Sequence, residues 1–293
     1  MLKFCKYILG VLLVLISVCL FFDKIFENIY KNGDDLNRIK YITSQKGKHF
    51  DIVFLGSSRV VNTIVPDVFD KTLNLNTVNF GIMDAQPMDI LTMAKLFESY
   101  NITYDTLFIQ LDYYFNSLNK SRFLYYELLP YINENDVVDS YYKFEKNYFF
   151  LKFVPFYKFA INDAKLGVRA EVAALFKNSN AIIRKNKGFE PLNGSGNTWQ
   201  RTLPKKIINN NKYIDSLERF KLSNHLNIKY FIAPFRSDTQ RMGFVNDLKG
   251  ELPNLIDFSS VILNDINFKN GYHLNQSGAI EFSELFANYI KNN

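Results

Sequence analysis

The sequence contains few of the residues that build redox or metal sites. Its 293 residues include two cysteines, three histidines and one tryptophan. Both cysteines, Cys5 and Cys19, lie in or beside one apolar run near the amino terminus, so the rest of the chain has no thiol. Such a body can form neither a disulfide nor a cysteine-ligated metal site. We therefore expect neither a metal nor a cofactor.

A strong excess of one charge is also missing. The 35 basic and 29 acidic residues leave a net charge of +6, and the basic residues are dispersed along the chain. This balance is too mild to indicate a protein that binds nucleic acid. With 47% hydrophobic residues, the chain has enough material for one large domain, or for a core with a subdomain.

The one long apolar run is Tyr7–Phe22, which holds no charge and follows Lys3 and Lys6. It is slightly shorter than the roughly 20 residues that span a bilayer, but the side chain of Lys6 can reach the interface. Lysines before the run and mixed charges after it predict a single membrane span. The amino terminus would then be inside and the body extracytoplasmic, in the periplasm or at the cell surface.

Two alternatives would treat this run as a leader. Signal peptidase prefers small residues such as alanine at its cleavage site, and the sequence has no alanine before Ala85. A lipoprotein modification at Cys19 would need a small residue where Val18 stands. We therefore interpret residues 1–22 as an uncleaved anchor, residues 23–50 as a polar helical stalk, and residues 51–293 as the main domain.

The main domain begins with Asp51-Ile52-Val53-Phe54-Leu55-Gly56-Ser57-Ser58-Arg59. Four large apolar residues in a row predict a strand buried on both faces, as in a parallel sheet. Gly56 permits a tight turn, and a serine after it would lie at the carboxyl end of the strand, where open α/β sheets bind ligands. On this stretch alone, Ser57 or Ser58 could equally cap the segment that follows.

Further strands and helices alternate along the chain. This alternation predicts βαβ units and a parallel sheet, and hence an α/β fold. The expected strands are 74–80, 106–111, 228–234 and 255–261, and the expected helices are 88–100, 217–226 and 279–291.

A polar loop near the other end, Asn270-Gly271-Tyr272-His273-Leu274-Asn275, precedes the last expected helix. A strand-end serine with a late histidine is typical of an activated nucleophile, because imidazole can take the hydroxyl proton and return it to the leaving group. Together the two segments resemble the SGNH/GDSL hydrolase superfamily, with Ser58 in the position of the nucleophile and His273 in that of the base. They are most similar to its membrane-anchored branch, which includes accessory proteins of polysaccharide or teichoic-acid O-acylation.

The resemblance implies a three-layer, flavodoxin-like parallel sheet. The segment 113–200 interrupts the alternation of strands and helices, and it is rich in aromatic residues that argue against a disordered linker. We interpret it as a mainly helical insertion. It could be a lid with its own small core, a groove wall that stacks on sugar rings, or a face against a membrane partner.

The middle blocks of the superfamily are altered. The resemblance aligns residues 79–85 with the block whose glycine supplies an oxyanion amide, and Asp84 stands in that glycine's place. The backbone N–H survives the change, but the carboxylate would repel an oxyanion unless it is turned away or protonated. Gly81 is the alternative donor, and the amide of Ser58 is another. The asparagine of the third block corresponds to Asn116, which is displaced by a couple of positions.

The last block differs as well. The family usually places an aspartate three residues before the histidine, and this chain has Asn270 there. Asparagine can orient an imidazole but does not stabilise the imidazolium by charge, and an Asp→Asn change in a serine triad costs on the order of 10⁴-fold in rate. Asp265 is the alternative acid.

Two functions remain open. The first is an esterase or O-acyltransferase, with acetyl the expected acyl group, that acts on a cell-surface glycan beside a membrane-bound O-acyltransferase as partner. The second is a catalytically weakened protein on the same fold, which binds glycan or docks on such an acyltransferase. The retained Ser58 and His273 favour the first function, and the altered blocks favour the second.

Overall fold

The computed structural model describes residues 1–32, 37–167, 169, 172–173, 182–196, 200–208, 211–252 and 254–293. The chain divides into two compact units. The helical unit comprises residues 1–36 and 125–180, and the larger unit comprises residues 37–124 and 181–293. The expected stalk, 23–50, is shared between the two units, and the expected insertion, 113–200, contributes to both.

The larger unit contains a sheet of five parallel strands in the order β2-β1-β3-β4-β5. This is the flavodoxin-like order of doubly wound folds, in which the connections change direction between β1 and β3. The expected α/β fold is therefore confirmed. The strands are β1 (His49–Leu55), β2 (Thr77–Asn79), β3 (Thr103–Gln110), β4 (Ile228–Ile232) and β5 (Ile256–Asp257).

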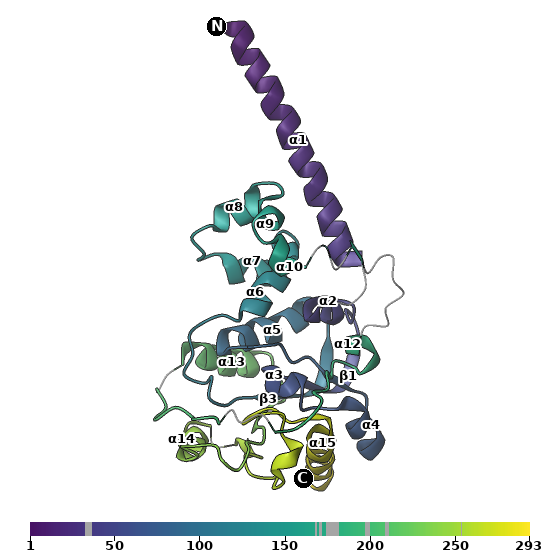
Figure 1. Ribbon diagram of the computed structural model, residues 1–293, viewed down its shortest axis with the longest axis vertical. Coiled ribbons are helices and arrows are strands. Elements are labelled where there is room, and N and C mark those ends of the chain that lie inside the picture. Colours follow the sequence, from purple (N-terminus) through teal and green to yellow (C-terminus); the bar gives the residue numbers. More distant parts are fainter. Residues whose placement is uncertain are drawn as a thin grey trace. The chain divides into compact units, whose positions relative to one another are not determined.

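Helices cover both faces of the sheet. On one face, α4 (Pro66–Leu73) lies beside α15 (Gln276–Asn292), whose Phe286 packs against Phe54 of β1 and Phe231 of β4, at centroid distances of 5.4 and 5.0 Å. On the other face, α5 (Pro87–Ser99) lies beside α13 (Lys212–Ser223). Figure 1 shows these two layers with the strands between them. Alternate residues of β1 face opposite layers, which is why its apolar run is continuous.

Shorter elements complete the larger unit. The strand expected at 255–261 shortens to two residues because the Asp257 carboxylate accepts the Ser259 N–H at 3.0 Å and turns the chain. The remaining elements are α2 (Arg38–Thr43), α3 (Ser58–Val61), α12 (Ile182–Lys185), α14 (Gly243–Glu251) and the 3₁₀ helix η2 (Asp265–Asn267).

The helical unit contains the long helix α1 (Leu2–Asn32). It is long and apolar enough to cross a membrane, and its most apolar stretch is unburied, so it is a candidate membrane anchor or signal sequence. The charged end of α1 packs inside the unit, where Lys158 forms a buried ion pair with Glu27 at 2.6 Å. The other elements are α6 (Arg122–Leu128), which begins in the larger unit, η1 (Leu129–Tyr131), α7 (Asp136–Tyr142), α8 (Tyr148–Phe153), α9 (Tyr157–Ala160) and α10 (Asp163–Leu166).

A buried ion pair joins three elements at the carboxyl edge of the sheet. Arg59 of α3 is fully buried, and its Nε lies 3.1 Å from Oδ2 of Asp112, just after β3. Its Nη2 donates to the carbonyl of Pro234 at 2.8 Å, beyond β4. Burial raises the pKa of Asp112 and lowers that of Arg59, and their mutual attraction opposes both shifts. The pair therefore fixes the residue that follows Ser58.

We expect Arg59→Met to lower the free energy of unfolding by about 3–5 kcal/mol, because it leaves the Asp112 carboxylate buried without its cation. Urea unfolding followed by circular dichroism measures this. The matched control is the double variant Arg59→Met/Asp112→Asn, which removes both charges and keeps an acceptor for the neighbouring donors. It should recover much of the loss. A double variant as unstable as the single one would show that the charge of Asp112 is not the cause.

Candidate functional site

The two serines that follow β1 have different contacts. Ser57 is the N-cap of α3, where its Oγ accepts the Arg59 N–H at 3.2 Å. Ser58 is the first residue of α3, and its Oγ lies 2.8 Å from Nε2 of His273. The capping interpretation therefore holds for Ser57, whereas Ser58 makes the contact with histidine that the sequence predicts.

His273 lies in the loop between η2 and α15. Its carbonyl accepts the Lys269 N–H at 2.8 Å, and the bridge between Phe268 and Leu274 closes the loop. Asn275 then caps α15 by accepting the Gly278 N–H at 3.0 Å. These backbone contacts hold the imidazole at the carboxyl edge of β1, 215 positions away from Ser58 in sequence.

Asn270 contacts the other nitrogen of the ring. Its Oδ1 accepts two backbone N–H groups, from Tyr272 at 3.2 Å and from His273 at 3.0 Å, and its Nδ2 lies 3.2 Å from Nδ1 of His273. A backbone N–H can only donate, so the amide is oriented with its oxygen toward the backbone and its NH₂ toward the ring. The NH₂ group also only donates, so Nδ1 must accept. The neutral imidazole therefore carries its proton on Nε2, facing Ser58.

This is the opposite tautomer from that of a general base. In a serine triad, a carboxylate accepts the Nδ1–H, which leaves Nε2 unprotonated and able to take the serine proton. Here, Nε2–H donates to Ser58 Oγ instead. The asparagine of a cysteine protease orients its histidine, but this amide does so with its donor rather than its acceptor.

The electrostatic surroundings also disfavour the imidazolium. Burial, together with the positive charges of Arg59 and Arg201, lowers the pKa of His273 to about 4. The ring is therefore neutral at pH 7. Protonating it during catalysis is costly because no carboxylate contacts it among the residues that the structure describes.

We expect ¹⁵N NMR of the full chain to show Nε2 of His273 protonated and Nδ1 unprotonated, with titration near pH 4. In Asn270→Asp, a carboxylate would accept the Nδ1–H and raise the pKa, so the proton should move to Nδ1 and the titration should shift to higher pH. The chain has only two other histidines, His49 and His225, which serve as internal controls. An Nδ1-protonated ring in the unaltered chain would contradict the assigned tautomer.

The structure does not bring the alternative acid, Asp265, to His273. Its carboxylate accepts the N–H of Ser237 at 3.2 Å and the hydroxyl of Ser237 at 2.8 Å. Asp265 starts η2, and these bonds tie that turn to the loop after β4. Asp265 therefore stabilises the contact between these two loops.

The structure also shows which of the predicted oxyanion donors are available to a ligand. Gly81 is unsuitable because its N–H already donates to Oδ1 of Asn79 at 3.0 Å. A Cβ at Gly81 would lie 2.7 Å from the backbone nitrogen of Val61, so glycine is needed there for close approach to α3.

Two backbone amides remain candidates for binding an oxyanion. The amide of Ser58 is the first of α3 and has no partner within that helix. Asp84 adopts a left-handed φ of 57°, and its Oδ1 accepts the hydroxyl of Tyr114 at 3.0 Å and the side-chain amide of Gln86 at 3.2 Å. These two donors offset the negative charge of the Asp84 carboxylate, which stands where the resemblance leads one to expect a glycine.

Asn116 does not take the role of the third-block asparagine. Its Oδ1 accepts the Ile208 N–H at 2.7 Å, and its Nδ2 donates to the carbonyl of Lys206 at 2.9 Å. Both ends of the amide therefore hold a loop.

Sequence reasoning missed Arg201, which lies beside the candidate site. Its guanidinium carbon is 3.8 Å from the ring of Tyr113 and 5.0 Å from that of Tyr272, and Tyr272 packs on His273 at a centroid distance of 4.4 Å. Its Nε is buried without a hydrogen-bond partner among the described residues. No spacing signal identifies this arginine, because its position depends on contacts made in the fold, such as the bond from the Gln240 N–H to its carbonyl at 2.9 Å.

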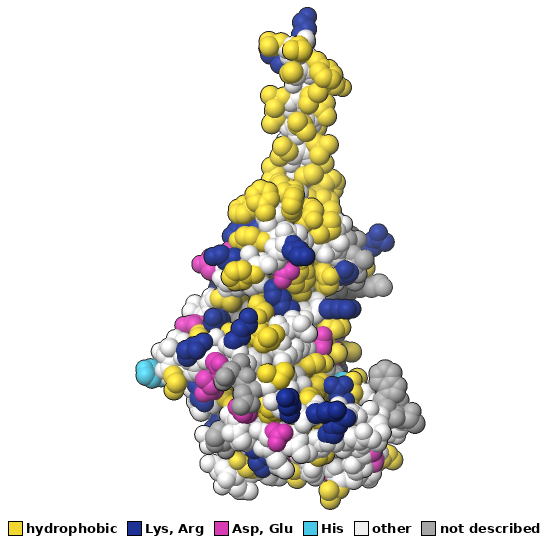
Figure 2. Space-filling view, turned by 90° about the vertical axis from the view of Figure 1, so that its left-hand side faces the viewer, with side chains coloured by type: hydrophobic (Ala, Val, Ile, Leu, Met, Phe, Trp, Pro, Cys, Tyr) yellow, Lys and Arg dark blue, Asp and Glu magenta, His cyan; other side chains and the backbone are white. Residues whose placement is uncertain are grey.

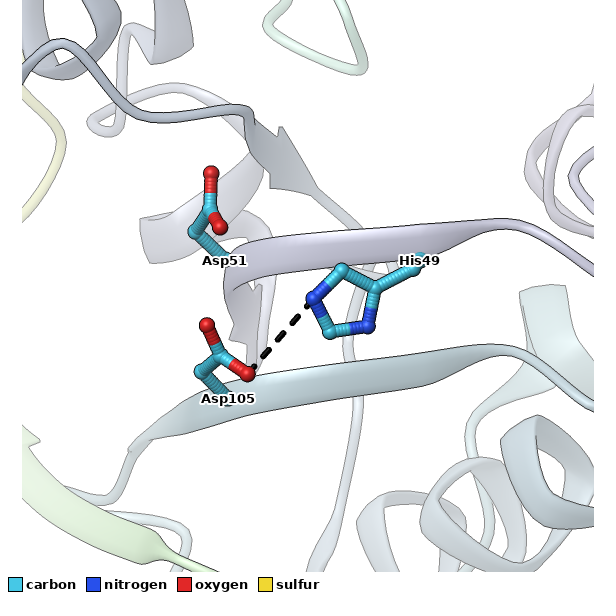
Figure 3. Close-up of side chains that lie close together, drawn as sticks. All are labelled: His49, Asp51 and Asp105. Carbon is cyan, nitrogen blue, oxygen red and sulfur yellow. Dashed lines mark ion pairs between the residues drawn. The ribbon is translucent and has the colours of Figure 1, made fainter.

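A second cluster lies at the opposite edge of the sheet, where β1 and β3 begin. His49, Asp51 and Asp105 have ligand atoms within 4.8 Å of one another (Figure 3). His49 Nε2 lies 3.5 Å from Asp105 Oδ1, His49 Nδ1 bonds Thr103 Oγ1 at 3.0 Å, and Asp51 accepts the Asn76 N–H. The three side chains therefore already have partners in this exposed cluster: His49 pairs with Asp105 and Thr103, and Asp51 pairs with Asn76. We assign the cluster no metal.

No family model matches the chain, and no curated protein matches it. Among solved structures, it is similar to a protein from Desulfitobacterium hafniense DCB-2 that is named as a lipolytic protein of the G-D-S-L family. The two share 12% sequence identity over 81% of this chain and 97% of the other, with a TM-score of 0.38. The likeness is distant, so the chemistry of the site rests on its own side chains.

Proposed function

We propose that this protein acts on acyl esters through Ser58 and His273, as an envelope-facing esterase or O-acyltransferase with attenuated turnover. The observation that carries the proposal is the 2.8 Å contact between Ser58 Oγ and His273 Nε2 at the carboxyl edge of a doubly wound sheet. Ligands bind at this edge, next to the change in strand order between β1 and β3.

The reaction needs the minor tautomer of His273. With the ring proton on Nδ1, Nε2 takes the Ser58 proton as Oγ attacks the ester carbonyl carbon, and the Ser58 and Asp84 amides stabilise the oxyanion. The tetrahedral intermediate collapses, Nε2–H protonates the departing alkoxide, and an acyl-serine remains. Water or a glycan hydroxyl then attacks the acyl carbon while Nε2 takes its proton. Collapse of the second tetrahedral intermediate breaks the bond from the acyl carbon to Ser58 Oγ, and Nε2–H returns the proton to that oxygen.

A second candidate function is a non-catalytic one, in which the fold binds glycan or docks on a membrane O-acyltransferase. The orientation of Asn270 favours it, because the resting ring presents a donor to Ser58. The low pKa of His273 also favours it, because a ring that resists protonation is a weak general base. The two candidates differ in whether any turnover depends on Ser58.

The setting is part of the same proposal. Basic residues before the apolar run of α1 support an extracytoplasmic body held at the membrane. A cell-surface glycan as acceptor and a membrane-bound O-acyltransferase as acyl supplier follow from the resemblance of the first and last sequence blocks.

We expect Asn270→Asp to raise the hydrolysis of 4-nitrophenyl acetate by the full chain, because a carboxylate restores the Nδ1–H tautomer and supports the imidazolium. The gain is bounded by the roughly 10⁴-fold cost of the reverse change in a serine triad. The acidic limb of the kcat/KM profile should also move up from near pH 4, since it reports the pKa of the free base.

Two variants control this experiment. Adding Ser58→Ala to Asn270→Asp should remove the gain, because the base then has no nucleophile. Asp265→Asn should leave the rate of the Asn270→Asp protein unchanged, because Asp265 is bonded to Ser237. Rates that stay flat and independent of Ser58 across the set would end the catalytic proposal in favour of the non-catalytic one.

A further inference from the structure

Helix α8 of the helical unit exposes a phenylalanine face, formed by Phe149, Phe150 and Phe153 with Phe144 just before the helix. The three residues of α8 are 62%, 49% and 58% exposed, whereas Leu151 of the same helix is 1% exposed. Phe149 and Phe153 are one turn apart, with ring centroids separated by 5.4 Å. Side chains of this size gathered on one face mark a contact surface rather than an ordinary aqueous surface.

The segment after α8 contacts α1 around Asp23, where the apolar run of α1 ends. The N–H of Phe156 donates to Oδ1 of Asp23 at 3.0 Å, and its ring lies 5.8 Å from that of Phe22 and 5.0 Å from that of Phe26. Phe156 has a left-handed φ of 65°, which is rare for a bulky residue and needs contacts that maintain it. The chain is therefore held where the apolar run of α1 ends.

Three shielded charges strengthen this attachment. Lys158 reaches Glu27 at 2.6 Å and Asp23 at 3.8 Å, and all three side chains are largely shielded from solvent. Phe153, the last residue of the phenylalanine face, is three residues before Phe156, which packs beside Phe22. Phe22 is the last apolar residue before Asp23. In Figure 2, apolar side chains continue from the rod of α1 onto the adjoining end of the helical unit.

We propose that the phenylalanine face inserts into the interfacial layer of the same bilayer that α1 crosses. The occupant is lipid, because the face continues the exposed apolar surface of α1 at the level where its span ends. Exposed Lys143 and Lys146 flank Phe144, and such lysines beside apolar residues are typical of helices that lie in an anionic interface. The helical unit then rests on the membrane surface instead of being raised above it.

The experiment places a tryptophan on the face of the full chain, reconstituted in phosphatidylcholine and phosphatidylglycerol vesicles. Phe149→Trp is made in a Trp199→Phe background, which removes the only natural tryptophan. We expect blue-shifted emission and quenching by brominated lipids at a depth of roughly 5–10 Å below the headgroups. Phe153→Trp should behave in the same way and provides a second report if the first variant folds poorly.

The matched control is Leu222→Trp in the same background. Leu222 is 70% exposed on α13 of the larger unit, and its emission should respond to aqueous iodide and not to brominated lipid. Equal iodide access at positions 149 and 222 would overturn the proposal. Protection from iodide at position 149 without quenching by brominated lipid would overturn it as well, because a second copy of the chain would then cover the face.

Discussion

The position of Ser58 depends on the buried guanidinium of Arg59. This side chain joins the start of α3 to Asp112 after β3 and to the carbonyl of Pro234 after β4, and it stacks 3.8 Å above the ring of Phe235. Three chain segments that leave neighbouring strands are thus tied together at one edge. If the Arg59 side chain moved away, the buried carboxylate of Asp112 would lose its cation, which is costly. Ser58, the preceding residue, is therefore held in place. The same charge lowers the pKa of His273, so the group that positions Ser58 also makes the imidazole a weaker base for the proposed reaction.

Much of the fold could be predicted because it depends on local patterns. An apolar run such as that of β1 is buried on both faces in a parallel sheet, and the turn at Gly56 must bring the next residues to its carboxyl end. For the sheet, a short stretch of sequence and one topological rule are sufficient. The meeting of Ser58 and His273 was expected instead from the resemblance of the first and last sequence blocks, and the structure places the two side chains 2.8 Å apart.

The details of the site depend on contacts between distant residues, which no local pattern encodes. Whether Asp265 could serve as an acid depended on its partner Ser237, and whether Gly81 could donate depended on the side chain of Asn79. Arg201 is held near the site by pairing with a distant segment, where its carbonyl accepts the Gln240 N–H. The sequence suggested that Asn270 lies beside His273, and the structure places its Nδ2 3.2 Å from Nδ1 of the ring. The orientation of the amide, however, follows from two backbone N–H groups that only the folded loop aligns.

The charge around the site has opposite effects on the two charges that the proposed acyl transfer would create. The guanidinium groups of Arg59 and Arg201 together place positive charge beside His273. That charge opposes formation of the imidazolium but favours the oxyanion of the tetrahedral intermediate, so the two effects partly cancel in the transition state. The resting tautomer of His273, with its proton on Nε2, opposes proton transfer from Ser58, and no other feature of the site offsets that effect among the described residues. The loop already presents two N–H donors to an acceptor at position 270, and a carboxylate would accept both of them and the Nδ1–H together. An NH₂ group in place of one carboxylate oxygen at position 270 is therefore the feature that most limits Ser58 in its proposed role as a nucleophile.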